Sequence, residues 1–395
     1  MERRIIHLNI ADFSVAVERV MDSRLRTRPL IIAQPSARSL VYDMSDEAYG
    51  AGVRKGMALS LARKRCPTAH ILPPRLEKYR KAMDACLQQV QPYTPLVERS
   101  SDTGHFYLDV SGVGRLFGPP QDIGLRLRRS MQKSLGLDPI WSVAPNKLLA
   151  KVASRLVKPR GEYILQEAGT SFLAPLALRI LPGVSQRDQL RLAHVNIWQV
   201  GQATALSVHE LSLLLGQQAH SLYRILRGID TSPVLPGASR QQRNTWYHHF
   251  SPDSNRETVI RAALLQLVTQ AGRTLRSRGL GCRQVGITVQ YTDGVLVSRQ
   301  GSVSQPLDEE KELQHLAATV LYRAWRRRVR LRCLSFTVGK LQHPVQQLSL
   351  LAHAPQSLAV RERDRSLSRA LDAIHFRCGT DKIMRGTQLL ARPSI

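Results

Sequence analysis

The segment IIHLNIADFSVAVE, residues 5–18, is the first place where this sequence could position a chemical site. Its apolar residues run up to Asn9 and Ala11, as in a short strand whose end carries functional side chains. An enzyme that acts on phosphate through two metal ions needs anionic oxygen ligands, which carboxylates supply. Asn9 offers one neutral carbonyl and Ala11 offers none. The segment therefore has the form of a metal-binding strand without its ligands.

Other residue types that could carry chemistry show no site pattern. The five cysteines lie far apart with no CxxC pair, at Cys66, Cys86, Cys282, Cys333 and Cys378. We predict free thiols in a reducing cytoplasm, and neither a zinc site nor a disulfide framework. The histidines at 220, 248, 249 and 343 have no ligand spacing, and Ser36 and Ser45 have no His and Asp partners for a nucleophile.

The charge balance limits the class of partner. In 395 residues, 57 Lys and Arg against 30 Asp and Glu give a formal net charge of +27. Such an excess, clustered at residues 24–28, 75–81, 126–133 and 323–332, predicts a nucleic acid partner. Membrane attachment is the competing explanation. It is not supported, because the sequence shows no apolar span of about 18 residues, no signal peptide and no lipidation motif.

Secondary structure has to position these residues, and its pattern changes along the chain. Residues 1–165 alternate between strand and helix patterns, which predicts an α/β or α+β domain. Residues 166–233 are helical, with a turn at LPGV (181–184) that is as typical of a helix-hairpin-helix as of a simple helix corner. Gly183, Val184 and Ser185 are the candidate DNA contacts, because backbone N–H groups at such a turn can hold a phosphate.

The remaining chain predicts a linker, a second domain and a tail. Residues 234–244 are rich in Pro, Gly and Ser, as linkers are. Residues 245–345 predict a helix (255–277), a hairpin that turns at Asp293-Gly294, a helix (308–328) and a strand (329–339). Its candidate DNA-binding residues are Arg326, Arg327, Arg328, Arg330 and Arg332. In the tail, residues 346–395, an amphipathic helix carries Leu367, Leu371 and Ile374 on one face.

Six motifs occur in the order found in the Y-family (DinB/UmuC-like) translesion DNA polymerases, which the whole chain resembles. They are IIHLNIADFSVAVE, EAYGAGVRKGM, FYLDVSG, APNKLLAKVASRLVKPRG, LPGV and RALDAIHFRCGTDKIMRG. The resemblance implies a multidomain right-hand architecture. The palm would be residues 1–165 with fingers inserted at about 12–75, the thumb 166–233 with its helix-hairpin-helix, and the little finger 245–345.

The resemblance also implies where the metal carboxylates of the family should lie. Those positions are occupied by Asn9, Ala11, Gly104 and His105, and none of these residues is acidic. Asp102 is the nearest acid, displaced by two residues.

The nucleotide pocket implied by the resemblance is altered as well. The triphosphate-binding pair falls on Asp46 and Tyr49, and the sugar gate on Ser14, while only Lys158 keeps its phosphate-binding type. Loss of metal ligands, triphosphate clamp and sugar gate together is a property of the ImuB-type members, and LDVSGVGRLFG (108–118) resembles their version of this strand.

A short tail segment resembles the pentapeptide by which bacterial polymerases dock on the sliding clamp. In QLSLL, Gln347 and Ser349 alternate with Leu348, Leu350 and Leu351, which would fill an apolar groove. The alternative interpretation is an edge strand.

Two functions follow. The first is a non-catalytic adaptor in DNA damage repair and SOS mutagenesis, which needs no cofactor, binds damaged primer-template and the sliding clamp, and recruits an active translesion polymerase. The second is an active DNA-directed DNA polymerase with a relocated Mg²⁺ site at Asp12, Asp102 and Asp109. Strand parity argues against Asp12, and Asp109 is more typical of a structural hydrogen bond.

Overall fold

The computed structural model describes residues 3–36, 39–99, 103–166, 169–236 and 244–343, together with residues 363, 366–374, 377, 383 and 386. The chain divides into two compact units, Met1–Arg240 and Gln241–Ile395. The division falls inside the segment that the sequence predicts as a linker. Among the described residues, no helix combines the length and the apolar character needed to cross a membrane.

The first unit is built on a five-stranded sheet in the order β5-β6-β1-β7-β8, called the central sheet below. Its strands are β1 (Ile5–Asn9), β5 (Val97–Arg99), β6 (His105–Asp109), β7 (Ile140–Ala144) and β8 (Glu162–Ile164). β1 pairs antiparallel with both β6 and β7. All five residues of β1 are buried, so this strand forms the middle of the fold.

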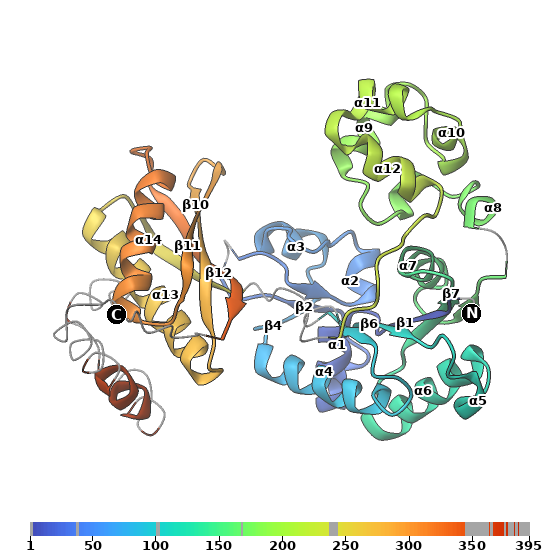
Figure 1. Cartoon of the computed structure of the whole chain (residues 1–395), viewed down its shortest axis with the longest axis horizontal. Coiled ribbons are helices and arrows are strands. Elements are labelled where there is room, and N and C mark those ends of the chain that lie inside the picture. The colour runs from blue at the N-terminus through green and yellow to red at the C-terminus, as the bar shows by residue number, and fades with distance from the viewer. Residues whose placement is uncertain are drawn as a thin grey trace, which may run out of the picture. The chain divides into compact units, whose positions relative to one another are not determined.

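Helices cover both faces of the central sheet (Figure 1). α1 (Phe13–Met21), α4 (Leu76–Val90) and α6 (Pro120–Leu135) share an apolar core with Ile6 and Leu8 of β1. α7 (Lys147–Leu156) packs on the opposite face, in the core that contains Ile5. Alternation of side chains along β1 explains the division. α6 approaches closely at Gly124, where a Cβ atom would lie 2.5 Å from the Trp141 ring.

A small sheet with its own core is inserted between α1 and α4. It consists of β2 (Leu30–Ile32), β3 (Asp43–Met44) and β4 (His70–Leu72) in the order β3-β2-β4. α2 (Asp46–Gly50) and α3 (Leu59–Arg65) lie between its second and third strands in sequence. Ile31, Val41 and Ala62 belong to its core. α1 itself packs in the core of the central sheet, so the insertion begins after this helix.

Residues 169–229 are helical and pack with α7 in one core. The helices are α8 (Gly169–Leu173), α9 (Gln186–Ala193), α10 (Val200–Thr204), α11 (Val208–Leu215) and α12 (Ala219–Leu226), with 3-10 turns at Leu178–Ile180 and Gly216–Gln218. The LPGV turn joins the first 3-10 turn to α9, so a full α-helix stands only on its C-terminal side. Gly183 has a φ of 91°, which favours glycine at this corner.

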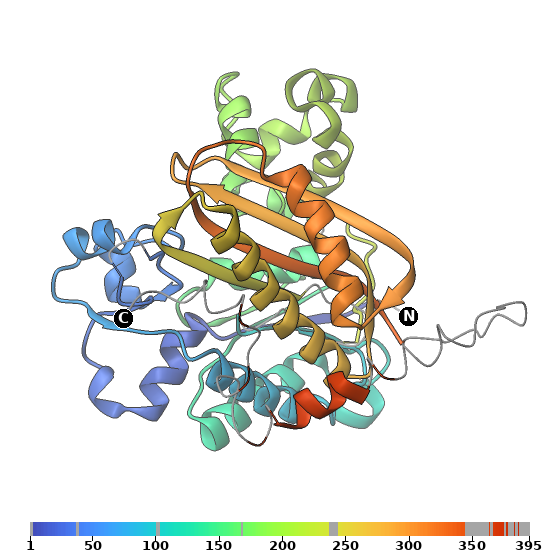
Figure 2. The same cartoon turned by 90° about the vertical axis from the view of Figure 1, so that its left-hand side faces the viewer.

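The second unit is an antiparallel sheet in the order β11-β10-β12-β9 with two helices on one face (Figure 2). Its elements are β9 (Asn244–Ser254), α13 (Glu257–Ser277), β10 (Gly281–Tyr291), β11 (Leu296–Leu307), α14 (Glu310–Ala324) and β12 (Leu331–Gln342). The sequence analysis missed β9, an edge strand in which only Phe250 is buried. The prediction of a helix to residue 328 was also wrong, because α14 ends at Ala324.

The described part of the tail is helical at residues 366–374. Asp372 accepts hydrogen bonds from Arg276 of α13 at 2.7 and 3.0 Å. Leu367 and Ile374 of this segment are exposed. The QLSLL segment, residues 347–351, lies outside the described residues.

Candidate active site

The predicted metal positions gather on the face of the central sheet that α7 covers. In the register of β1 and β6, Asn9 lies opposite His105, and His7 lies opposite Tyr107. Strand alternation puts these four side chains on one face. Asn9 is 1% exposed, and its Nδ2 has no hydrogen-bond partner among the residues that the structure describes. A neutral amide and an imidazole therefore lie where the resemblance implies carboxylates.

A chain of hydrogen bonds assigns the tautomers of the two histidines. Ser154 Oγ donates to the backbone oxygen of Lys151 at 3.0 Å. Its oxygen is then the acceptor for His7 Nδ1, 2.7 Å away, which leaves His7 Nε2 as an acceptor. His105 Nδ1 lies 3.2 Å from this Nε2 and is the donor. The other nitrogen of a neutral His105, Nε2, is therefore an acceptor.

The surroundings keep both imidazoles neutral. Burial lowers the pKa of His7 well below its usual value, and His105 and Lys151 act in the same direction. Burial lowers the pKa of His105 to about 3, with Lys151 and Lys158 adding to the shift. The His7 ring stacks 4.6 Å from that of Tyr107 and 5.3 Å from that of His105, centroid to centroid. The group is a stack of neutral rings at neutral pH.

Gly104, the second predicted carboxylate position beside β6, has no room for a side chain. Its φ is 75°, and a Cβ atom would lie 2.8 Å from Phe13 Cβ and 2.9 Å from the backbone oxygen of Ile10. Neither neighbour can move freely, because Ile10 N donates to Gly104 O at 2.9 Å and Phe13 is buried. An aspartate at this position would require the chain between β1 and α1 to shift.

Three acids, called the acidic trio below, gather at the predicted nucleotide pocket: Asp12, Asp43 and Asp46. Burial raises the pKa of Asp12 to about 7, and a hydrogen bond to Asp46 and the charge of Asp43 act in the same direction. Lys158 opposes this shift, and Lys55 pairs with Asp43 at 2.8 Å. The cations that could attract a triphosphate are therefore next to carboxylates that repel it.

The two other pocket positions are used inside the fold. Ser14 is buried, and its backbone N–H donates to Asp43 Oδ2 at 3.2 Å. Tyr49 is exposed, and the guanidinium of Arg54 stacks over its ring at 3.8 Å. Neither side chain supplies a cation.

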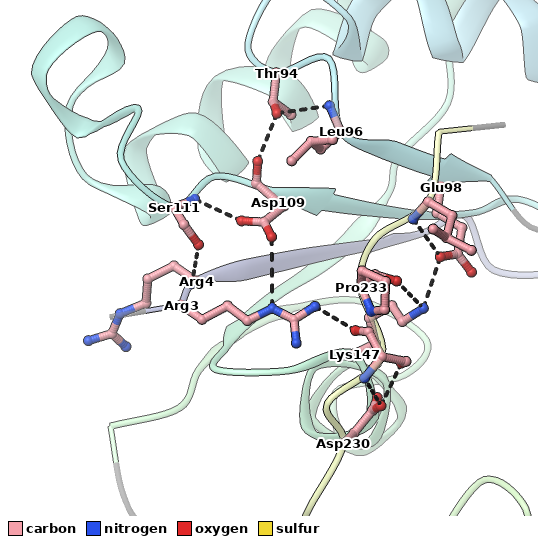
Figure 3. Close-up of polar contacts among 12 residues, drawn as sticks. Arg3, Arg4, Thr94, Leu96, Glu98, Asp109, Ser111, Lys147, Asp230 and Pro233 are labelled. Carbon is pink, nitrogen blue, oxygen red and sulfur yellow. Dashed lines mark hydrogen bonds and ion pairs between the residues drawn. The ribbon is translucent and has the colours of Figure 1, made fainter. Parts of the chain in front are cut away.

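The acids proposed for a relocated metal site do not meet. Asp109 lies at the end of β6 that pairs with the start of β1, whereas Asp12 follows the end of β1. Five strand residues therefore separate the two positions, a distance of about 13 Å or more. Asp109 accepts from Ser111 N at 3.0 Å and pairs with Arg3 at 3.8 Å (Figure 3). Asp102 lies outside the described residues.

A pair of Mg²⁺ ions does not match these residues. Mg²⁺ requires several hard oxygen ligands in octahedral geometry. Within the described ranges, no group of three His, Cys, Asp or Glu side chains is arranged to hold a metal ion.

Residues 230–235, called the strap, connect α12 to the linker and lie along the central sheet (Figure 3). Asp230 accepts from a backbone N–H in the first turn of α7 at 3.1 Å. Lys147 Nζ donates to Glu98 at 2.9 Å and to the backbone oxygen of Pro233 at 2.8 Å. Glu98 also accepts from a strap N–H at 3.1 Å. These contacts fix the strap on the sheet edge.

A cavity of about 730 Å³ lies between the central sheet, α7, α12 and the strap. His105 and Tyr107 line it from β6, Lys151 from α7 and Arg224 from α12. Sequence reasoning missed this cavity, because its wall comes from segments that are far apart in the chain and share no motif.

The predicted DNA contacts at the LPGV turn are partly occupied. Ser185 caps α9, where its Oγ accepts from Asp188 N at 3.1 Å. The Asp188 carboxylate in turn accepts from the backbone N–H of Ser185 at 3.3 Å. A carboxylate therefore takes one of the N–H groups that a phosphate would need. Gly183 and Val184 form the corner itself, with Val184 buried.

The predicted arginines lie in the loop after α14 and at the start of β12. Arg327 pairs with Asp293 at 2.6 Å and lies 4.8 Å over the Tyr291 ring. The exposed members are Arg326, Arg328 and Arg330, whereas Arg332 is half-buried.

The open face of the second unit's sheet differs from the expected basic platform. A hollow of about 560 Å³ on this sheet is lined by Thr245, Gln284, Gly286, Thr288, Ser298, Arg299, Gln300, Thr337 and Gly339. Arginine 299 is the one charged residue among them, so the surface is polar and almost neutral. Small neutral residues at alternate strand positions gave no motif by which the sequence analysis could have found it.

Comparison with known proteins agrees with this architecture. Residues 8–155 match the model of the impB/mucB/samB family, and residues 248–350 match its C-terminal domain. The DNA polymerase IV of Desulfatibacillum aliphaticivorans is 31% identical over 387 residues, which cover 97% of this chain and 96% of the relative. The DNA polymerase IV of Pelotomaculum thermopropionicum is 30% identical over 390 residues, covering 98% and 95%.

Solved structures show the same fold. The Y-family DNA polymerase chimera Dbh-Dpo4(243-245)-Dbh superposes with a TM-score of 0.74 at 20% identity, covering 85% of this chain and 98% of its own. DinB from Sulfolobus solfataricus gives a TM-score of 0.62 at 19% identity, covering 85% and 98%. The fold and the family inferred from the sequence motifs are thus confirmed, and the chain belongs to the Y family of translesion DNA polymerases.

Proposed function

We propose that this Y-family chain is a non-catalytic, ImuB-like protein that binds DNA during damage bypass and recruits an active translesion polymerase. The observation that carries the proposal is Gly104, where a φ of 75° and two contacts below 3.0 Å exclude any carboxylate side chain. Asn9 and Ala11 supply no anionic ligand beside it. Two-metal phosphoryl transfer depends on such ligands.

The acidic trio supports the same function. A deoxynucleotide triphosphate carries several negative charges, and the trio adds carboxylates where its phosphates would lie. Asp43 already holds Lys55, and Asp12 lies close enough to Lys158 to feel its charge. We expect weak or no triphosphate binding.

DNA binding is retained in this proposal because it needs cations and not metals. A net charge of +27 supplies them. QLSLL would dock on the sliding clamp by filling an apolar groove with Leu348, Leu350 and Leu351. The protein would then hold damaged primer-template at the clamp for the partner polymerase.

The second candidate is an active DNA polymerase with a relocated Mg²⁺ site. Its support is that the relatives described above are named DNA polymerase IV. Such a site would have to use Asp102 with the acidic trio, because Asp109 lies at the far end of β6.

Primer extension decides between the two. The whole chain is incubated with primer-template, the four deoxynucleotides and either Mg²⁺ or Mn²⁺, with an active DNA polymerase IV as the positive control. The adaptor proposal expects no template-directed incorporation with either metal. Incorporation that Asp102→Ala or Asp12→Ala abolishes would overturn it in favour of the second candidate.

A further inference from the structure

We infer that His105 binds a hydroxyl group at the end of a nucleic acid strand, as a neutral hydrogen-bond acceptor that works without metal. The inference rests on the proposed function, because it treats the altered palm site as a binding site and not as a reaction centre. It concerns the cavity between the central sheet, α7, α12 and the strap.

The first step is that the acceptor cannot change role. The chain of hydrogen bonds runs from His105 Nδ1 through His7 and Ser154 to the backbone oxygen of Lys151. A carbonyl oxygen only accepts, so each group before it is fixed in turn. His105 Nε2 is left with a lone pair, and His105 lines the cavity.

The second step is that the ring is held in place. His105 stacks on His7 with an interplanar angle of 11°. It also belongs to β6, whose backbone pairs with Asn9 of β1. A lone pair on a fixed ring selects ligands with an O–H or N–H group at one position, and an ordered acceptor of this kind loses little entropy on binding.

The third step is the charge of the wall. Its two carboxylates have partners, because Glu98 pairs with Lys147 at 2.9 Å and Asp230 accepts from Ser232 N at 2.9 Å. Lys151 and Arg224 then face the cavity from α7 and α12, and Arg224 donates to the neutral hydroxyl of Thr231 at 3.0 Å. Two cations on opposite walls suit a phosphodiester.

The fourth step is size. A volume of about 730 Å³ lies in the range of pockets that take one small ligand. A stretch of duplex is too large for it, whereas the last nucleotide of a strand is not. A terminal nucleotide presents a phosphodiester and a free hydroxyl side by side, which matches the cations and the acceptor.

Fluorescence anisotropy in EDTA and without nucleotides tests this inference on the full chain. The probes are primer-templates that differ only at one strand end. One series carries a 3′-hydroxyl, a 3′-hydrogen or a 3′-phosphate, and a second series carries a 5′-hydroxyl, a 5′-hydrogen or a 5′-phosphate. The two series distinguish which end supplies the hydroxyl, and one salt concentration is used throughout because phosphate contacts dominate total affinity.

Three variants separate the hydrogen bond from structure. His105→Phe keeps a ring on His7 and removes the acceptor, and His105→Gln restores an acceptor on a flexible chain. His209→Phe, on the exposed side of α11, is the matched control. Thermal melting establishes that each variant is folded.

For the wild type and His209→Phe, we expect a hydroxyl end to bind about three- to tenfold more tightly than the hydrogen end. His105→Phe should abolish this ratio while total affinity stays close to wild type, and His105→Gln should recover part of it. Equal binding of both ends by the wild type would overturn the inference. So would an unchanged ratio in His105→Phe, or tighter binding of a phosphate end. Nucleotide incorporation in the primer-extension assay would instead count against the proposed function, so the two failures are distinguishable.

Discussion

Asn9 and His105 lie directly opposite each other where β1 and β6 end. The pair is buried on the side of Asn9, whose amide donor lacks a partner among the described residues. Leaving such a donor unsatisfied costs about 1 to 3 kcal/mol. The family's carboxylate positions are therefore replaced by groups that neither bind metal nor pack ideally, and Gly104 closes the remaining position from the side.

Gly104 gives the sharpest stability prediction. Gly104→Ala should lower the free energy of unfolding by about 2 to 4 kcal/mol, because a positive φ and contacts below 3.0 Å act together. Urea unfolding measures the change.

Gly56 separates the two causes. Its φ is 79°, and a Cβ atom there would have nothing within 4 Å. Gly56→Ala should therefore cost only about 1 kcal/mol. Equal losses in the two variants would show that crowding at Gly104 is unimportant, and would remove the argument that a carboxylate cannot stand there.

The architecture was predictable because its signals are local. The apolar run of β1 and the N-cap residue Asn146, whose side chain accepts from Leu149 N at 2.9 Å, are read directly from neighbouring residues. The same holds for the two long helices of the second unit. β9 was missed because an edge strand with one buried residue has no strong alternation.

The site was predictable only in part, since its geometry depends on residues far apart in sequence. Motif comparison pointed to Asn9 and His105. It could not show the hydrogen bond from His105 to His7, or the use of Ser154 on another element as the next partner. The partnership of Ser185 with Asp188 was also open to sequence reasoning as a capping box, although the turn was interpreted through phosphate binding instead.

Asp12 predicts a pH dependence of stability. Its pKa in the folded chain is raised to about 7 from 3.8. Between these values the folded state holds the proton more tightly than the unfolded state, so the free energy of unfolding falls as pH rises from about 4 to 7. Asp12→Asn should remove this loss and stabilise the protein by about 1 to 2 kcal/mol at pH 8, a figure reduced for partial solvent exposure. Below pH 4 it should have little effect.

Urea unfolding at several pH values checks the Asp12 prediction. Glu162→Gln, at an exposed position of β8, is the control for removal of a carboxylate from the first unit. A constant effect of Asp12→Asn between pH 4 and 8 would contradict a raised pKa.

The tail peptide predicts a separable function. Leu348→Ala combined with Leu351→Ala should abolish capture of the chain by immobilised sliding clamp, because both side chains would fill the apolar groove. DNA affinity should stay unchanged, since neither residue is charged. Leu367→Ala with Ile374→Ala, two exposed positions of the tail helix, is the matched control. Clamp capture that survives the first double substitution would show that QLSLL is not the docking peptide.

The arginine loop after α14 predicts different roles for adjacent residues. DNA binding by a chain of this charge should weaken steeply with salt, with a slope that reports the number of phosphate contacts. Arg328→Ala should lower that slope by about 1, because Arg328 is exposed and free to reach a phosphate. Arg327→Ala should change the slope less and cost about 1 kcal/mol of stability, because its guanidinium is held between Asp293 and Tyr291. Plots of log Kd against log salt concentration measure both slopes, with Arg261→Ala, a residue paired with Glu257 on α13, as the control. A larger slope change for Arg327→Ala than for Arg328→Ala would reverse this assignment, and would mean that DNA displaces the Asp293 pair when it binds.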